Sequence, residues 1–253
     1  MLDLKLAVLI DADNIPSTYI KEMLEEISKN GTPTIKRIYG DWTKAHLTGW
    51  KNVLLENAIT PIQQYSYTTG KNSSDSALII DAMDILYSEK VSGFCIVSSD
   101  SDFTRLATRL REAGMVVIGI GEKKTPQPFI VSCDKFIYIE ILKPEEKETA
   151  LKDTERTPSK TTSKRVTKAL DKIDRQTVKL IMNSVEDLSD EAGWTFLALL
   201  GSYISKKKPD FDPRNYGFAK LYDLIKHMNK FEIDERESGG HKHVKHIYIR
   251  IKE

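Results

Sequence analysis

The sequence predicts an α/β fold with a mainly parallel sheet, followed by a small second domain that is largely helical. Short apolar runs of strand type alternate with amphipathic helical segments over residues 6–139, as in parallel sheets that are covered on both faces. Several of these apolar runs end abruptly in acidic and small polar residues. A charged segment that is poor in apolar residues then separates this part from a second set of helical patterns.

Apolar and β-branched runs predict the strands of the first domain. They cover residues 6–10, 34–39, a short piece of 59–67, 94–97, 115–120 and 136–139. Helical spacing of apolar residues predicts helices over 20–27, from Ser74 or Asp75 to Leu86, and over 103–110. The alternation favours crossover helices that join neighbouring parallel strands.

Residues 143–172 are rich in Lys, Glu, Thr and Ser, which is the composition of a flexible linker. Beyond them, apolar spacing predicts helices around 178–185, 194–204 and 218–228, and alternation predicts strands over 231–236 and 244–251. Three helices followed by a β-hairpin is the order of a winged helix-turn-helix. We therefore expect domains at 1–142 and 173–253, joined by a linker at 143–172.

The composition limits the classes of protein to which this chain can belong. The chain has 253 residues, of which 40% are hydrophobic and 30% charged, and a net charge of +1, so a surface for nucleic acid must be a local basic patch. Cys95 and Cys133 have no metal-ligand spacing and suit a reducing compartment. No signal-peptide pattern or membrane-length apolar run is present, so we expect a cytoplasmic protein without membrane contact.

Aspartates follow two of the expected strands. Asp11 ends the first apolar run, Asp100 and Asp102 follow the run at 94–97, and Asp75 starts a helix. If the two strands are neighbours, these carboxylates meet at one edge of the sheet, where their repulsion requires a counter-charge. Mg²⁺ or Mn²⁺ suits such oxygen ligands, and it activates water for attack on a phosphodiester. No His/Cys cluster indicates zinc.

Other residues have weaker assignments. Asn14 is placed to orient a carboxylate or a water, and Asp13 either does the same or caps a helix. Asp81 lies six residues after Asp75, so the two do not share a helical face and Asp81 is an outer candidate. Helix capping also explains Asp75 or Asp102 taken singly.

Three ordered blocks resemble the NYN domain, a PIN-like nuclease fold. They are LIDADN at 9–14, GKNSSD at 70–75 with Asp81 after it, and VSSDSDF at 97–103. The resemblance covers the first domain and implies a three-layer α/β/α sandwich with metal-dependent endonuclease activity, usually on RNA. It places Asp11, Asp75 and Asp100 at the core acidic positions. It also makes Asp102 a further acid, Asp81 a recurrent helical acid and Lys71 a phosphate contact.

The segment DPRNYGFAKL at 212–221, followed by Leu224 and Ile225, resembles the LOTUS, or OST-HTH, domain. This resemblance implies a winged-helix variant that binds RNA and sometimes a protein partner. Basic residues attract phosphates and aromatic residues stack bases. The nucleic-acid contacts we predict on this basis are Lys206, Lys207, Lys208, Arg214, Tyr216 and Lys220.

Two other functions stay open from the residues. Asp11 and Asp13 also fit the nucleophile motif of haloacid-dehalogenase-like phosphatases, although Ile15 and Pro16 depart from its continuation. A noncatalytic RNA-binding adaptor would use only the second domain. We favour a metal-dependent endoribonuclease with a tethered RNA-binding module, and pairing of two nuclease domains as a homodimer stays open.

Overall fold

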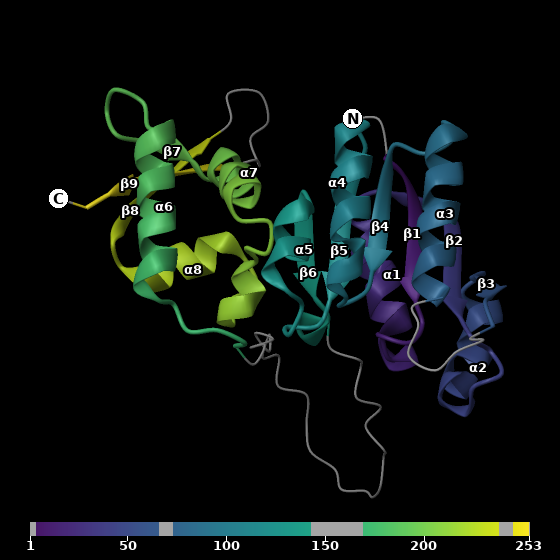
Figure 1. The fold of residues 1–253 in the computed structure, drawn as a ribbon. Helices are drawn as coiled ribbons and strands as arrows, with labels where there is room; N and C mark the ends of the chain where they lie inside the picture. The colour runs from purple at the N-terminus through teal and green to yellow at the C-terminus, as the bar shows by residue number, and fades with distance from the viewer. Residues whose placement is uncertain (1–3, 66–72, 143–168, 238–244, 253) are drawn as a thin grey trace, which may run out of the picture.

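The computed structural model describes residues 4–65, 73–142, 169–237 and 245–252 (Figure 1). The N-terminal part contains a six-stranded parallel sheet flanked by helices. The C-terminal part contains helices and a three-stranded antiparallel sheet. The fold class predicted from the sequence, including the small winged helix-turn-helix domain, is confirmed.

The strands of the parallel sheet follow the spatial order β3-β2-β1-β4-β5-β6. All five neighbouring pairs are parallel. The strands are β1 (Lys5–Asp11), β2 (Thr32–Gly40), β3 (Thr60–Gln63), β4 (Gly93–Val97), β5 (Val116–Gly121) and β6 (Lys135–Tyr138). Each overlaps a predicted apolar run, and the two central strands, β1 and β4, are buried on both faces.

Alternation along β1 divides the apolar core into two layers. Leu6, Val8 and Ile10 pack against the helices of one face, and Ala7 and Leu9 pack against those of the other. The first face is covered by α1 (Ile20–Ser28) and α2 (Thr48–Glu56). The second is covered by α3 (Ser73–Tyr87), α4 (Thr104–Glu112) and α5 (Gln127–Ser132). The result is a three-layer α/β/α sandwich.

The order in which the chain adds strands to the sheet reverses between β1 and β4. From β1 the chain proceeds outward through β2 to β3, and it then returns to β4 and proceeds outward on the other side. Ile10 lies opposite Val97 in the register, so Asp11 and Ser98 leave the sheet side by side. This switch point, at the carboxyl ends of the two central strands, is where open α/β sheets form their binding crevice.

The C-terminal domain packs three helices on one face of its sheet. Its elements are α6 (Arg175–Leu188), β7 (Thr195–Phe196), α7 (Leu197–Lys207), α8 (Leu221–Met228), β8 (Phe231–Glu237) and β9 (Lys245–Ile251). Trp194, which we predicted inside the second helix, precedes β7, and α7 begins only at Leu197. The reason is that β7 pairs with β9, and the buried Thr195 side chain donates a hydrogen bond to the Val185 carbonyl (2.9 Å).

The C-terminal domain lies against β6, the edge strand of the parallel sheet (Figure 1). The Phe136 amide donates to the Pro209 carbonyl (2.8 Å), and the Tyr138 hydroxyl donates to the Asp210 carboxylate (2.8 Å). Most of the predicted linker, residues 143–168, lies outside the described residues. Leu170 follows it and packs against both layers of the N-terminal core. In the described parts of the chain, no helix has the length and apolar character needed to cross a membrane.

Candidate active site

Asp11 is the centre of the polar residues at the switch point. It ends β1, and its side chain is almost completely buried. Its carboxylate accepts hydrogen bonds from Asn14 Nδ2 (2.5 Å), Ser98 Oγ (2.9 Å) and the Asp13 amide (3.2 Å). Burial raises the pKa of Asp11, and these donors offset part of that rise because they favour the charged form. Asn14 thus lies where it can orient the Asp11 carboxylate, and its role in catalysis stays a prediction.

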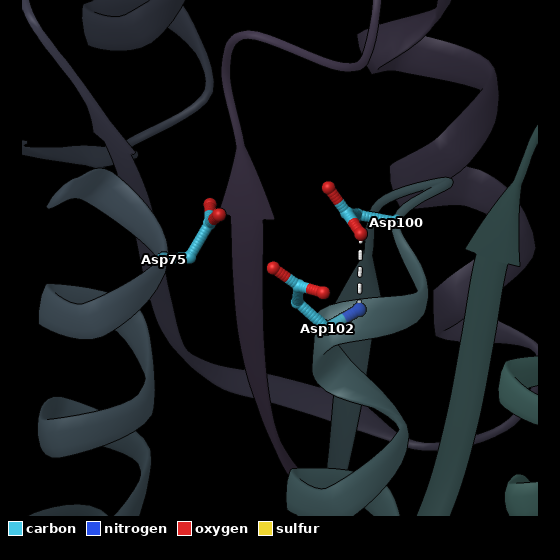
Figure 2. Close-up of side chains that lie close together, drawn as sticks. All are labelled: Asp75, Asp100 and Asp102. Atoms are coloured by element: carbon cyan, nitrogen blue, oxygen red, sulfur yellow. Dashed lines mark hydrogen bonds between the residues drawn. The ribbon is translucent and has the colours of Figure 1, made fainter. Parts of the chain in front are cut away.

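Three further aspartates come together beside Asp11. Asp75 lies in the first turn of α3, while Asp100 and Asp102 lie where β4 leads into the short 3-10 turn Ser101–Phe103 (Figure 2). One carboxylate oxygen from each lies within 4.8 Å of the others. The Asp102 amide donates to Asp100 Oδ1 (2.9 Å), so the turn itself sets the spacing of these two residues. Asp100 is the N-cap of this turn, so the capping role that we considered for Asp102 belongs to Asp100, and both residues lie in the cluster.

Among the described residues, burial and the neighbouring acids both disfavour the charged form of Asp75. Burial raises the pKa of Asp75 to about 6, and the charges of Asp11, Asp100, Asp102 and Asp13 raise it in the same direction. A carboxyl group in this state is stabilised by a cation or by a proton. Clustered carboxylate oxygens are the donors that Mg²⁺ and Mn²⁺ prefer. The residues therefore fit a divalent cation of this class.

Asp81 is placed differently from the cluster. Its carboxylate accepts hydrogen bonds from the Arg37 guanidinium and from the Tyr39 hydroxyl, both on β2. Tyr39 is completely buried; burial and the bond to Asp81 raise the pKa of Tyr39. Asp81 thus attaches α3 to the sheet below Asp75. Lys71, the predicted phosphate contact, lies outside the described residues.

Two residues at this edge were not assigned from the sequence. Ser98 is completely buried, donates to Asp11 and accepts a hydrogen bond from the Asp100 amide (3.1 Å), so it connects the two acidic strand ends. His46 Nε2 lies 2.8 Å from Asp13 Oδ1. The position of Ser98 directly after a buried strand was a usable signal. His46 gave none, because it is 33 residues from Asp13.

The predicted nucleic-acid contacts of the C-terminal domain have varied surroundings. Lys206 and Lys220 are exposed, and Lys207 pairs with Asp187 (2.5 Å). Tyr216 is buried, and its hydroxyl lies 3.1 Å from Thr177 Oγ1 and 3.5 Å from the half-buried Lys208 Nζ. The Tyr216 ring therefore stabilises the turn from inside, and its role in binding RNA stays a prediction.

Arg214 forms an ion pair between the two domains. Its guanidinium donates to both carboxylate oxygens of Glu26 on α1 (2.9 and 2.7 Å) and also to Asp212 (2.6 Å from Nη2). Burial acts to raise the pKa of Glu26, but the hydrogen bonds and charges of Arg214 and Lys29 outweigh it and hold this pKa at about 2. Contact between Arg214 and RNA would require this pair to break.

These features define a class: a PIN-like α/β domain with carboxylates clustered at its switch point, followed by a winged helix-turn-helix domain. The chain matches the family model of the NYN domain over residues 5–140 and that of the OST-HTH/LOTUS domain over residues 168–243. The chain belongs to the NYN domain family and carries an OST-HTH/LOTUS domain after it. Both resemblances seen in the sequence are confirmed.

Three solved structures resemble parts of this chain. A protein of unknown function from Vibrio parahaemolyticus is 19% identical, with 54% of this chain and 93% of that chain covered, at a TM-score of 0.45. An uncharacterized protein from Nitrosomonas europaea is 33% identical, with 40% and 92% covered, at a TM-score of 0.30. A Chromobacterium violaceum protein is 28% identical, with 32% and 86% covered, at a TM-score of 0.26. None of the curated proteins compared with the chain matches it.

Proposed function

We propose that this protein is a metal-dependent endoribonuclease whose C-terminal domain, residues 173–253, binds RNA. The observation that carries the proposal is the group of carboxylates from Asp75, Asp100 and Asp102 beside the buried Asp11. Membership of the NYN family supports nuclease chemistry, and the OST-HTH/LOTUS domain supports RNA as the substrate. The proposed setting is the cytoplasm, where the buried thiols of Cys95 and Cys133 would stay reduced.

Each residue of the site has a separate task in this proposal. Asp11, Asp75, Asp100 and Asp102 hold Mg²⁺ or Mn²⁺, and Asn14 and Ser98 orient the Asp11 carboxylate through their hydrogen bonds. When bound, the cation supplies an activated water and stabilises the leaving oxygen of the phosphodiester. Asp81 fixes α3, so that Asp75 keeps its position relative to the strand ends.

The test is cleavage of labelled single-stranded RNA by the purified full-length protein. We expect cleavage with Mn²⁺ or Mg²⁺ and none with EDTA, while Asp100→Asn should lose activity without losing its fold. A parallel set of DNA substrates tests the preference for RNA. Metal-independent cleavage, or equal activity in the Asp100→Asn variant, would refute the mechanism. Binding of RNA without cleavage of any substrate would instead identify a noncatalytic adaptor.

A further inference from the structure

Six side chains form a continuous series of contacts on the sheet of the C-terminal domain. We call them the stacking ladder: Trp194, Phe196, Arg236, His246, Tyr248 and Arg250. The Arg236 Cζ atom lies 4.2 Å from the Tyr248 ring centroid and 5.2 Å from that of Trp194, and the Arg250 Cζ atom lies 4.8 Å from Trp194. The Phe196 centroid lies 5.5 Å from that of Tyr248 and 5.2 Å from that of His246. Ring and guanidinium planes thus follow one another across three strands.

The register places this ladder on the outer face of the sheet. Arg236 lies opposite His246 on the neighbouring strand, and Phe196 lies opposite Tyr248. The alternate residues of β9, Ile247, Ile249 and Ile251, pack into the apolar core with the helices. Successive side chains of a strand point to opposite faces, so the ladder faces away from the helices. In Figure 1, β8 and β9 pass behind α6, which covers the inner face.

The aromatic rings of the ladder do not belong to the apolar core of this domain. Trp194, Phe196 and Tyr248 are only partly buried and stand apart from the core cluster, which is complete around Leu200, Leu224 and Ile249. The arginines lie over the rings in a fixed orientation. Asp234 accepts from the Arg236 Nε atom (2.8 Å) and Glu232 from Arg250 (3.0 Å from Nε), so each carboxylate occupies one edge of a guanidinium.

We propose that the stacking ladder is a surface on which bases of single-stranded RNA stack, and this rests on the RNA-binding function proposed above. Aromatic rings and guanidinium planes are the groups that stack unpaired bases. Residues 245–252 contain Lys245, Arg250 and Lys252 and no acid. Carboxylates of β8 pair with Lys245 and Arg250, whereas the Lys252 ammonium donates to the neutral Asn229 side chain (2.7 Å) and keeps its charge for a phosphate. Phosphates would lie along this strand while bases stack on the ladder.

The surroundings of the predicted contacts favour this surface. Tyr216 is buried, whereas the rings of the ladder are only partly buried. Basic residues are paired on both surfaces, Arg214 with Glu26 and Lys207 with Asp187 on one, and Arg236 with Asp234 and Arg250 with Glu232 on the other, so the rings make the difference. Lys206 and Lys220 can attract phosphates, but neither supplies a ring. The ladder instead joins three aromatic rings, a histidine and two arginines on one face of the domain.

Direct binding tests the proposal without cleavage. The full-length Asp100→Asn protein, kept in EDTA, is titrated into fluorescently labelled single-stranded RNA and followed by anisotropy. We expect Arg236→Gln with Arg250→Gln to raise the Kd about tenfold. The matched control is Arg175→Gln with Lys179→Gln, which removes two positive charges from exposed positions on α6 and should change the Kd less than twofold. Circular dichroism checks that both double variants are folded.

Tryptophan fluorescence gives a second readout at the ladder itself. The emission of Trp194 is the difference between the spectra of the Asp100→Asn protein and the same protein with Trp194→Phe. We expect bound RNA to quench this emission, because a base stacked on Trp194 contacts the indole. A folded ladder variant with unchanged Kd, or Trp194 emission unchanged by bound RNA, overturns the proposal. RNA that binds through the ladder but is never cleaved with Mn²⁺ overturns only the nuclease proposal.

Discussion

Replacing Asp75 with Asn should stabilise the metal-free protein, although it removes a residue that we assign to the active site. Asp75 is 8% exposed and surrounded by other acids, which is why its pKa rises to about 6 from 3.8. Asparagine has nearly the same shape and carries no charge. The variant therefore removes the electrostatic cost of holding this carboxylate beside Asp11, Asp100 and Asp102 while keeping the packing of α3.

The magnitude follows from the two pKa values. A rise of about 2 pH units corresponds to about 3 kcal/mol of lost folding free energy once Asp75 is ionised. Asn also loses the favourable interaction of an acid with a helix N-terminus, about 0.5 kcal/mol. We expect a net gain of about 2.5 kcal/mol. The raised pKa means that the folded state binds the proton of Asp75 more tightly than the unfolded state does. The stability of the wild-type protein therefore falls as pH increases from 3.8 to 6. The stability advantage of Asp75→Asn is complete only above pH 6.

Urea unfolding in EDTA, followed by tryptophan fluorescence, measures this difference at pH 4, 6 and 7.5. Trp42 and Trp50 report on the N-terminal domain. Asp84→Asn is the control, because Asp84 is exposed on the same helix, and its effect should be near zero at every pH. Added Mn²⁺ should stabilise the wild-type protein and not Asp75→Asn. An Asp75→Asn variant that is no more stable at pH 7.5, or equally stabilised at pH 4 and 7.5, would refute the reasoning.

Three further predictions concern the residues around the cluster and the domain junction. Asp81→Asn should lower the free energy of unfolding by about 2 kcal/mol in urea, because it weakens the ties to Arg37 and Tyr39, and an unchanged midpoint would contradict this role. Ser98→Ala should weaken Mn²⁺ binding about tenfold in calorimetry, since it leaves Asp11 less well oriented, and unaltered affinity would count against the site. Glu26 has a depressed pKa of about 2, so its contribution to the junction is present above pH 4.5 and is lost as pH falls toward 2. Glu26→Gln should accordingly enlarge the radius of gyration measured by X-ray scattering at pH 7, and a compact variant would refute the ionic junction.

The strand ends were predictable because burial and polarity change there within one or two residues. A short apolar run such as residues 94–97 is typical of a strand that is buried on both faces of a parallel sheet. The acids that follow the run mark the carboxyl end of that strand. Asp81 shows where this reasoning stops. Asp81 interacts with Arg37, which is 44 residues away, and no local pattern specifies that pair.

The turn at residues 212–217 shows the same limit more clearly. A proline, an arginine and an aromatic residue in a turn are consistent with an RNA contact, with a structural role, or with an interface. The structure uses Arg214 as an interface residue, since its carboxylate partner Glu26 lies 188 residues earlier in the chain. Only the tertiary arrangement distinguishes these uses, because the same guanidinium binds a phosphate or a carboxylate with equal geometry.

The junction also solves a problem that the parallel sheet creates. A sheet that ends in β6 leaves the backbone donors of that strand open to pairing with another chain. The Pro209 carbonyl accepts a hydrogen bond from the Phe136 amide. The side chain of Asp210 bonds to Tyr138, and that of Arg214 bonds to Glu26. The edge is thus covered by the domain to which we assign RNA binding. Because these contacts involve a buried ion pair, loss of one partner would leave the other charge uncompensated. These contacts are therefore the ones that would keep the stacking ladder in a set orientation relative to the aspartate cluster.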